Sequence, residues 1–479
     1  MNRGMAFVAV ALVYLAVLIS LAVIGNRKNK GDEHQFLLAG GSLGTIIGFL
    51  TFFATLYSTF ILIGMPNFFR VHGVGTWIFL GVTDMALAVF TLWLSLKLRE
   101  RISSTDFRSI SDLVRETFSS RGVFVYVLGL VIFLVPYIAI QIKGASGILA
   151  HIVPYEVPQW GWAVIILFLM YLYSSIGGLR GIMYCDSLQG VVLFTVIWIM
   201  AFIVLDNFGG LGKLVQAVAA EKPELLSTPG PKGLLSVQWL IAGFISIVLL
   251  PVSQPQLTSR LSILKGLNER RKIPVLHASF TFLLLIAGLI IGLYGAVAIP
   301  AKTGPEFIGK LILEQNPVIG AVALIGILAA AMSTSDSQFF ALGSEINNAL
   351  GRFSRKLKVS PIVFVKLVIL VFCIAAFIVA MKSSQGIISL AVSGFMGTAL
   401  MAPMVLTSIL CKGRSFGTVI PVVTAISLVV FLLSLFGLVP SMVMGLRTDL
   451  ILLAINTLIT ISVVLTELKK TNKTFQQPS

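Results

Sequence analysis

The residues best suited to chemistry lie in one polar stretch of an otherwise apolar segment, "GILAAAMSTSDSQ" at 326–338. On a helix, Ala330, Ser333 and Thr334 occupy positions i, i+3 and i+4, so one carbonyl and two hydroxyls share a face. Such oxygens are neutral hard ligands, whereas thiolates and imidazoles select transition metals. The stretch predicts a site for a weakly held monovalent cation such as Na⁺. The alternative is that these hydroxyls bond carbonyls of their own helix or join neighbouring helices.

Two other segments carry residues that interrupt helices. The segment 43–68 has several hydroxyls followed by Gly64 and Pro66, and the segment 237–256 ends with Pro251 and Pro255. Broken helices expose backbone carbonyls and helix-end dipoles inside a membrane, which is where transporters bind their substrates. The alternative is a simple kink, because proline and glycine are tolerated in membrane helices.

The elements that must position these residues are membrane-spanning helices. Of 479 residues, 57% are hydrophobic and only 11% are charged, which is far from the composition of soluble domains. Apolar runs of about twenty residues recur, and the alternating pattern of a β-barrel does not. The sequence predicts an all-α integral membrane protein with thirteen spans, at 6–25, 43–68, 75–96, 123–149, 158–176, 183–205, 237–256, 275–300, 318–346, 361–381, 386–410, 417–438 and 448–467.

Most of the 35 lysines and arginines fall in alternate loops, and Arg101, Arg260 and Arg270 are among them. Basic residues gather in cytoplasmic loops, so this distribution predicts an outside N-terminus, a cytoplasmic C-terminus and location in the cell membrane. It also explains the formal charge of +16 without nucleic acid. The three cysteines form no metal-binding pattern. No nucleophile–base pair or metal-ligand cluster suggests an enzyme, and no obligate protein partner is inferred.

The two interrupted segments start five helices apart, and five is odd. A unit that begins at the first therefore enters the membrane from the opposite side to a unit that begins at the second. This spacing predicts an inverted repeat, with one copy at about 43–205 and the other at about 237–410. One helix before the repeats and two after them complete a single transmembrane domain over 1–479.

Five stretches in this order resemble the sodium:solute symporter family, which includes proline, pantothenate, sialic acid, monocarboxylate and sodium/glucose carriers. They are "LLAGGSLG", "IGMP", "GGLRGIMYCDSLQG", "SQPQLTSRL" and "ILAAAMSTSDSQ". The resemblance covers essentially all the spans. It implies a LeuT-type fold with five-plus-five inverted repeats and Na⁺ as the coupling ion.

The resemblance also implies ion sites. The family's main sodium site corresponds to the carbonyls of Ala54, Tyr57 and Ala330 with the hydroxyls of Ser333 and Thr334. A second site, present in some members, would use Ser333, Ser337, Asp336 and Asp186. The chain departs from the family at Asp336, where a hydroxyl is more common, and at Leu56, where several relatives have an aspartate.

Polar residues near the two interruptions predict the solute site. They are Thr55, Ser58, Thr59, Gln141, Ser253 and Gln254, with Phe52, Phe53, Phe60 and Trp77 as candidate walls or gates. This mixture suits a small polar organic solute. Carboxylate-bearing solutes are favoured because helix N-termini attract anions, and a monocarboxylate, pantothenate and an amino acid all remain open.

Charged residues inside spans are functional candidates, because charge in a bilayer is costly. Asp84 lies near the middle of one span. Lys143 either extends to the interface, binds a solute carboxylate or pairs with Asp84.

The sequence thus predicts a symporter in which a Na⁺ gradient drives solute uptake by alternating access. One rival is proton coupling through Asp336 or Asp186, and another is a sensor that binds solute without accumulating it.

Overall fold

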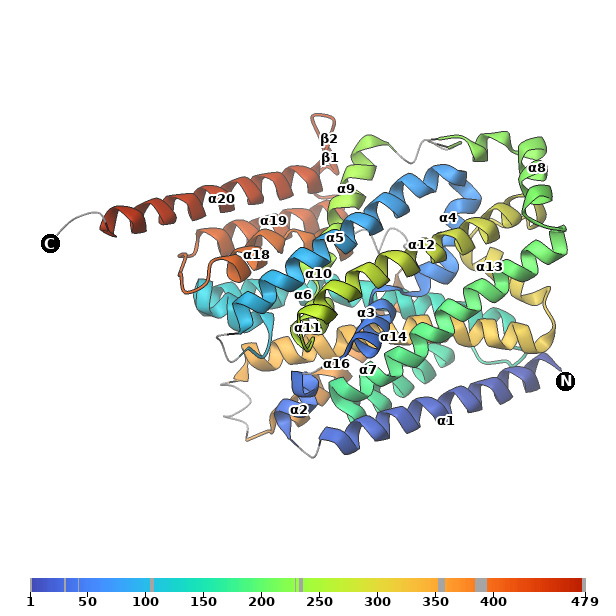
Figure 1. Cartoon of the computed structure of the whole chain (residues 1–479), viewed down its shortest axis with the longest axis horizontal. Helices are drawn as coiled ribbons and strands as arrows, with labels where there is room; N and C mark the ends of the chain where they lie inside the picture. The colour runs from blue at the N-terminus through green and yellow to red at the C-terminus, as the bar shows by residue number, and fades with distance from the viewer. Residues whose placement is uncertain are drawn as a thin grey trace.

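The computed structural model describes residues 2–29, 32–41, 43–103, 107–228, 230–231, 236–351, 358–383 and 394–475. Long helices run roughly along the longest axis, and the N- and C-termini lie at opposite ends of it (Figure 1). The helices are α1 Arg3–Asn29, α2 Glu33–Leu38, α3 Thr45–Leu56, α4 Met65–His72, α5 Thr76–Ile102, α6 Ile110–Ile152, α7 Gln159–Phe208, α8 Leu211–Glu221, α9 Val237–Val248, α10 Leu250–Ser253, α11 Pro255–Ser262, α12 Leu267–Ala298, α13 Gly304–Leu313, α14 Pro317–Ala349, α16 Pro361–Lys382, α18 Ala402–Leu410, α19 Val419–Leu435 and α20 Thr448–Phe475. A two-stranded hairpin, β1 Met442–Val443 and β2 Leu446–Arg447, precedes α20.

Within the described residues, 8 helical segments are long and apolar enough to cross a membrane, and shorter apolar helices include α3, α9 and α19. The protein is therefore a multi-pass membrane protein. The predicted spans 158–176 and 183–205 both lie in α7, where Gly178 (φ 60°, ψ −162°) interrupts the helix. The predicted span 386–410 begins outside the described residues, and its later part is helical. The predicted number of spans and the repeat arrangement remain predictions.

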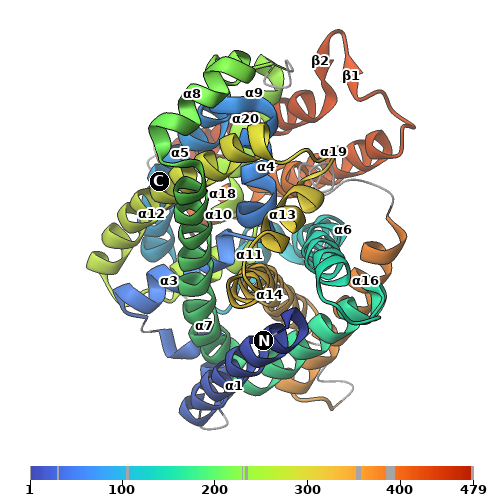
Figure 2. The ribbon, with the colours of Figure 1, turned by 90° about the vertical axis from the view of Figure 1, so that its right-hand side faces the viewer.

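Helix α14, which carries the polar stretch, lies inside the bundle. Viewed along the long axis, it is surrounded by other helices (Figure 2), and it contacts α1, α3, α6, α7, α11 and α16. In the most apolar 18-residue stretch of α14, 83% of the residues are buried. Alanine, glycine and serine are abundant in α14, and small residues allow neighbouring backbones to approach closely. The polar side chains of α14 are thereby removed from lipid.

Small residues also bring α1 close to α7. A Cβ atom added at Gly25 would lie 2.5 Å from the Gly181 Cα and 2.6 Å from its nitrogen. Backbone atoms cannot rotate away, so we expect Gly25→Ala to destabilise the protein by about 1–3 kcal/mol. The measurement is the thermal unfolding midpoint in detergent. Gly212→Ala on α8, where an added Cβ meets nothing within 4 Å, is the control, and equal midpoints in both variants would contradict this packing.

Two arginines predicted to lie in inner loops are buried instead. Arg270 donates to the carbonyls of Leu261 (2.7 Å) and Ser95 (3.0 Å), and Arg101 donates to the carbonyl of Ser408 (3.0 Å). The last carbonyls of a helix have no partner within the helix. The guanidinium groups supply partners to the last-turn carbonyls of Leu261 and Ser408, and Arg270 also joins α11 to α5 through Ser95.

Candidate functional site

The first interrupted segment is broken in its middle, as the sequence predicts. Helix α3 ends at Leu56, and Tyr57 has an extended backbone (φ −93°, ψ 108°). Helical structure resumes at Phe60 as a π-helical turn that ends at Gly64. The carbonyls in the last turn of a helix lack intrahelical donors. The break therefore frees carbonyls of α3 for ligands from outside the helix.

The polar face of α14 lies against this break. The Ser333 hydroxyl donates to the Ala54 carbonyl at 2.9 Å and lies 3.3 Å from the Ala330 carbonyl. The neighbouring Thr334 hydroxyl is buried and has no hydrogen-bond partner among the described residues. Buried polar groups are rarely unpaired. Freed carbonyls beside an unpaired hydroxyl are suited to a monovalent cation. Tyr57, whose carbonyl the resemblance implies as a further ligand, lies at the break itself.

A second polar cluster surrounds the fully buried Asp186 of α7. Its Oδ2 accepts hydrogen bonds from Thr51 (2.6 Å), Thr55 (3.3 Å) and Ser337 (3.3 Å). Arg260 places its Nη2 atom 3.1 Å from the same oxygen and 2.6 Å from the Ser337 hydroxyl. The guanidinium therefore lies between two residues that the resemblance assigned to a second sodium ion.

The structure corrects the predicted position of Arg260, which the charge distribution assigned to an inner loop. Its side chain is only 1% exposed, and it extends from α11 into the Asp186 cluster. A buried carboxylate needs a counter-charge and hydrogen bonds, and Arg260 provides both. The available signal was its position in "SQPQLTSR", directly after the second interrupted helix.

Asp336 contacts a different neighbour. Its Oδ2 accepts a 2.5 Å hydrogen bond from the Tyr173 hydroxyl, and its Oδ1 has no partner among the described residues. Successive residues on a helix point about 100° apart, so Asp336 bonds Tyr173 and makes no described hydrogen bond to the side chain of Ser337, Asp186 or Arg260. Of the four residues suggested for a second site, the hydrogen bonds join Asp186 and Ser337, while Ser333 bonds across to α3.

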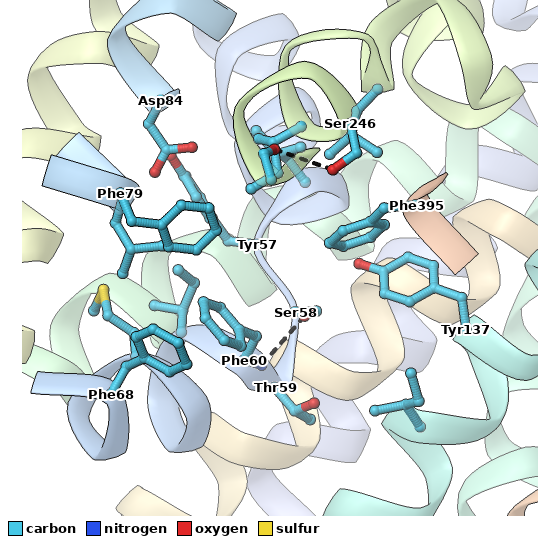
Figure 3. A pocket seen from close by; sticks show the side chains of 18 of the residues that line it. Tyr57, Ser58, Thr59, Phe60, Phe68, Phe79, Asp84, Tyr137, Ser246 and Phe395 are labelled. Carbon is cyan, nitrogen blue, oxygen red and sulfur yellow. Dashed lines mark hydrogen bonds between the residues drawn. The ribbon is translucent and has the colours of Figure 1, made fainter. Parts of the chain in front are cut away.

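A cavity of about 110 Å³ opens at the break (Figure 3). The predicted residues Ser58, Thr59 and Gln141 line it. Gln141 Oε1 accepts from the Thr59 amide (3.1 Å) and hydroxyl (2.6 Å), which ties the break to α6. The remaining lining residues are mostly apolar: Leu56, Tyr57, Phe60, Ile61, Met65, Phe68, Phe79, Leu80, Asp84, Tyr137, Ile140, Trp239, Ala242, Gly243, Ser246, Ile247, Leu250, Phe395 and Arg447.

Three predicted solute ligands are not among these lining residues. Thr55 belongs to the Asp186 cluster. Ser253 and Gln254 lie past Leu250, the last lining residue of that segment, and the Gln254 carbonyl oxygen Oε1 accepts from Gln256 (2.6 Å). The second break, at Gln254 (φ −118°, ψ 114°), therefore lies beyond the cavity wall.

Of the four aromatic residues proposed as walls or gates, only Phe60 lines the cavity. The others have ring partners elsewhere: Phe52 packs on His277, Phe53 on Tyr57, and Trp77 on Phe282. His277, which sequence reasoning did not select, is buried and stacks on the Tyr57 ring (centroids 5.5 Å apart). The Tyr57 ring is therefore fixed by packing around the break at the edge of the cavity that it lines.

Charged residues at the cavity differ in their partners. Lys143, which is not among the lining residues, donates to the Ser383 carbonyl (2.6 Å). Arg447 forms two hydrogen bonds with Asp449 (3.1 and 2.6 Å). Asp84 has no hydrogen bond or ion pair within the part of the chain that the structure describes. Asp84 thus lines the cavity with a carboxyl group that has no described partner.

The sequence and the fold are similar to those of known sodium-coupled transporters. The model of the "Sodium:solute symporter family" matches residues 36–421. A sodium/proline symporter of Staphylococcus aureus (strain bovine RF122 / ET3-1) is 25% identical over 426 residues, which cover 84% of this chain and 80% of that protein. The sodium/proline symporter of strain JH9 is 25% identical over 418 residues, with the same coverage.

Two solved structures share the fold. A Na⁺-coupled sialic acid symporter in a substrate-bound outward-open state has a TM-score of 0.78 at 18% identity, covering 97% of this chain and 98% of its own. A nucleobase-cation-symport-1 family transporter, closed with bromovinylhydantoin bound, has a TM-score of 0.61 at 14% identity, with 91% and 95% covered. At these sequence identities, both similarities show a shared fold.

Proposed function

We propose, from the premise that this chain belongs to the sodium:solute symporter family, that the break in α3 binds sodium on one side and solute on the other. The protein is a multi-pass symporter coupled to Na⁺, and its relatives are transporters, not enzymes. Sodium would be held by the carbonyls of Ala54, Tyr57 and Ala330 and the hydroxyls of Ser333 and Thr334. The observation that carries this assignment is the buried, unpaired Thr334 hydroxyl beside the Ser333–Ala54 contact.

Coupling would follow from the short distance along the chain between the two sites. Ala54 contacts α14, and four residues later Ser58 lines the cavity. Sodium would join α14 to α3 and favour the state open to the outside, and its loss to the inside would loosen both helices and release solute. Each ligand must prefer the same conformation for symport to occur.

The solute would occupy the cavity in contact with Ser58, Thr59 and Gln141. Among carboxylate-bearing solutes, an amino acid fits better than a monocarboxylate or pantothenate. Arg447 is already paired with Asp449, whereas the Asp84 carboxylate has no described partner and would repel a purely anionic solute. An amino acid brings a positive group as well as a carboxylate.

The predicted membrane arrangement belongs to the same proposal. Thirteen spans with inverted repeats at about 43–205 and 237–410 would put the N-terminus outside and the C-terminus in the cytoplasm. The opposite positions of the two termini support an odd number of crossings (Figure 1). Uptake would then run from outside to inside, down the Na⁺ gradient.

The experiment is uptake by purified protein in liposomes, with an inward Na⁺ gradient compared with a K⁺ gradient. The labelled solutes are acetate, pyruvate, lactate, pantothenate, proline and sialic acid. We expect Na⁺-dependent accumulation of the amino acid, because a gradient can drive a solute only when both bind the same state. Equal accumulation in K⁺ would contradict sodium coupling.

Two rivals give different results in the same liposomes. Proton coupling through Asp186 or Asp336 predicts uptake that follows a pH gradient in sodium-free medium. A sensor predicts sodium-dependent binding with no accumulation. Asp186 already has a counter-charge in Arg260, so this pairing does not favour proton coupling through Asp186.

A further inference from the structure

The cavity contains a half-buried carboxylate among aromatic rings. Asp84 lies on α5, five residues after Phe79, and both line the cavity. In Figure 3 the Asp84 carboxylate and the Phe79 ring lie on the same wall, facing Tyr137 and Phe395 across the cavity. No hydrogen bond or ion pair is made by Asp84 within the described residues, so its charge is available to a ligand.

Aromatic rings cover both walls of this space. Trp239 packs on Phe79 (centroids 4.5 Å apart) and stacks on Phe68 (5.9 Å, interplanar angle 17°). On the opposite wall, Tyr137 and Phe395 meet edge to face at 4.8 Å. The faces of aromatic rings attract organic cations, and the attraction is strongest where water is excluded.

The chemistry of the walls distinguishes an organic cation from a bare metal ion. A small hard cation needs a shell of several oxygen ligands. Around Asp84 the lining is mostly carbon, and the Ser246 hydroxyl donates back to the Gly243 carbonyl of its own helix (3.0 Å). An alkylammonium group can be satisfied by one carboxylate and several ring faces.

We infer that the transported solute carries an alkylammonium group, which binds between the Asp84 carboxylate and the ring cluster of Phe68, Phe79 and Trp239. This inference deepens the proposed function and rests on it, since it names the chemistry of the solute at that same cavity. It restricts the cargo to amino acids, betaines and amines, and it excludes simple carboxylates.

The test is protection of a cysteine placed in the cavity. In the full-length protein, Ser246→Cys is labelled with a thiol reagent in NaCl, and the parent protein measures labelling of its own cysteines, of which Cys185 and Cys373 are buried. The ammonium probes are choline, glycine betaine and proline. The matched neutral probe is 3,3-dimethylbutan-1-ol, which has the shape of choline without the charge, and the anionic probe is pyruvate.

We expect at least one ammonium probe to slow labelling while the neutral and anionic probes do not. Asp84→Asn should raise the concentration for half-protection by about 30-fold or more, because the ligand's charge loses its carboxylate partner. Asp84→Glu, which keeps the charge, should retain most of the protection, and size-exclusion profiles check that both variants fold. Protection only by 3,3-dimethylbutan-1-ol or pyruvate, equal protection in Asp84→Asn, or no protection by any probe would overturn the inference.

This readout is independent of sodium coupling. Protection is measured at equilibrium without a gradient, so a failure of symport would leave it unchanged. Conversely, sodium-driven uptake of pyruvate that is unaffected by Asp84→Asn would support the proposed function and overturn the inference about the solute.

Discussion

Replacing Ser333 and Thr334 together by alanine should raise the sodium concentration for half-maximal uptake by roughly a hundredfold or more. The double variant removes two of the five oxygen ligands proposed for the ion, and a contact to a charged group contributes about 1.5–3 kcal/mol. No other described side chain replaces the Ser333 hydroxyl, which donates to the Ala54 carbonyl. The measurement is initial uptake rate against sodium concentration in liposomes.

The same helix supplies a matched control. Ser335 is buried on α14, but its hydroxyl donates to the Ala331 carbonyl of its own helix at 2.8 Å. Ser335→Ala removes one buried hydroxyl from the same region and should leave sodium activation within about twofold of the parent, since this hydroxyl contacts no proposed ion ligand outside its own helix turn. Unchanged sodium activation in the Ser333 and Thr334 double variant would remove the site assignment.

The contact between the polar face of α14 and the break in α3 could be predicted because its signal is local. The spacing of Ala330, Ser333 and Thr334 fixes which oxygens share a face of the helix. The break in α3 is signalled by Gly64 and Pro66 a few residues later. The family resemblance then supplied Ala54 as the partner across the break, and the structure has that contact.

Other parts of the site depend on tertiary packing. Arg260 reads as a loop cation in sequence, because nothing in "LTSRL" shows that α11 directs it toward Asp186. The wall around Asp84 comes from segments that lie far apart in the chain, including Trp239 and Phe395. The direction of the side chains beyond the second break could not be predicted from the sequence either. Ser253 and Gln254 are predicted to line the cavity, but they are not among its lining residues.

The Asp186–Arg260 pair should show the largest effect on stability. Arg260→Gln and Asp186→Asn are each expected to lower the free energy of unfolding by about 3–5 kcal/mol, because each leaves a buried charge without its partner. The double variant should lose much less than the sum, since it contains neither charge. The measurement is the fraction of monodisperse protein after heating in detergent. Additive losses would show that the two side chains do not stabilise each other.

Sodium provides a sharper test of what Arg260 does. In the parent protein its guanidinium lies between Asp186 and Ser337, so a second sodium ion is not needed there and sodium activation should be hyperbolic. Without Arg260, the Asp186 carboxylate and the hydroxyls of Ser337 and Thr51 are oxygen ligands suited to a hard cation.

Arg260→Gln, combined with Ser333→Ala and Thr334→Ala to weaken the main site, should therefore be stabilised against heating by NaCl but not by KCl. The matched variant carries Arg70→Gln in place of Arg260→Gln, because Arg70 donates to the Ala301 carbonyl (2.9 Å) away from the Asp186 cluster. It should show no such difference between the salts. If sodium and potassium act alike on the Arg260 variant, the guanidinium is a structural tie rather than a built-in substitute for a second ion.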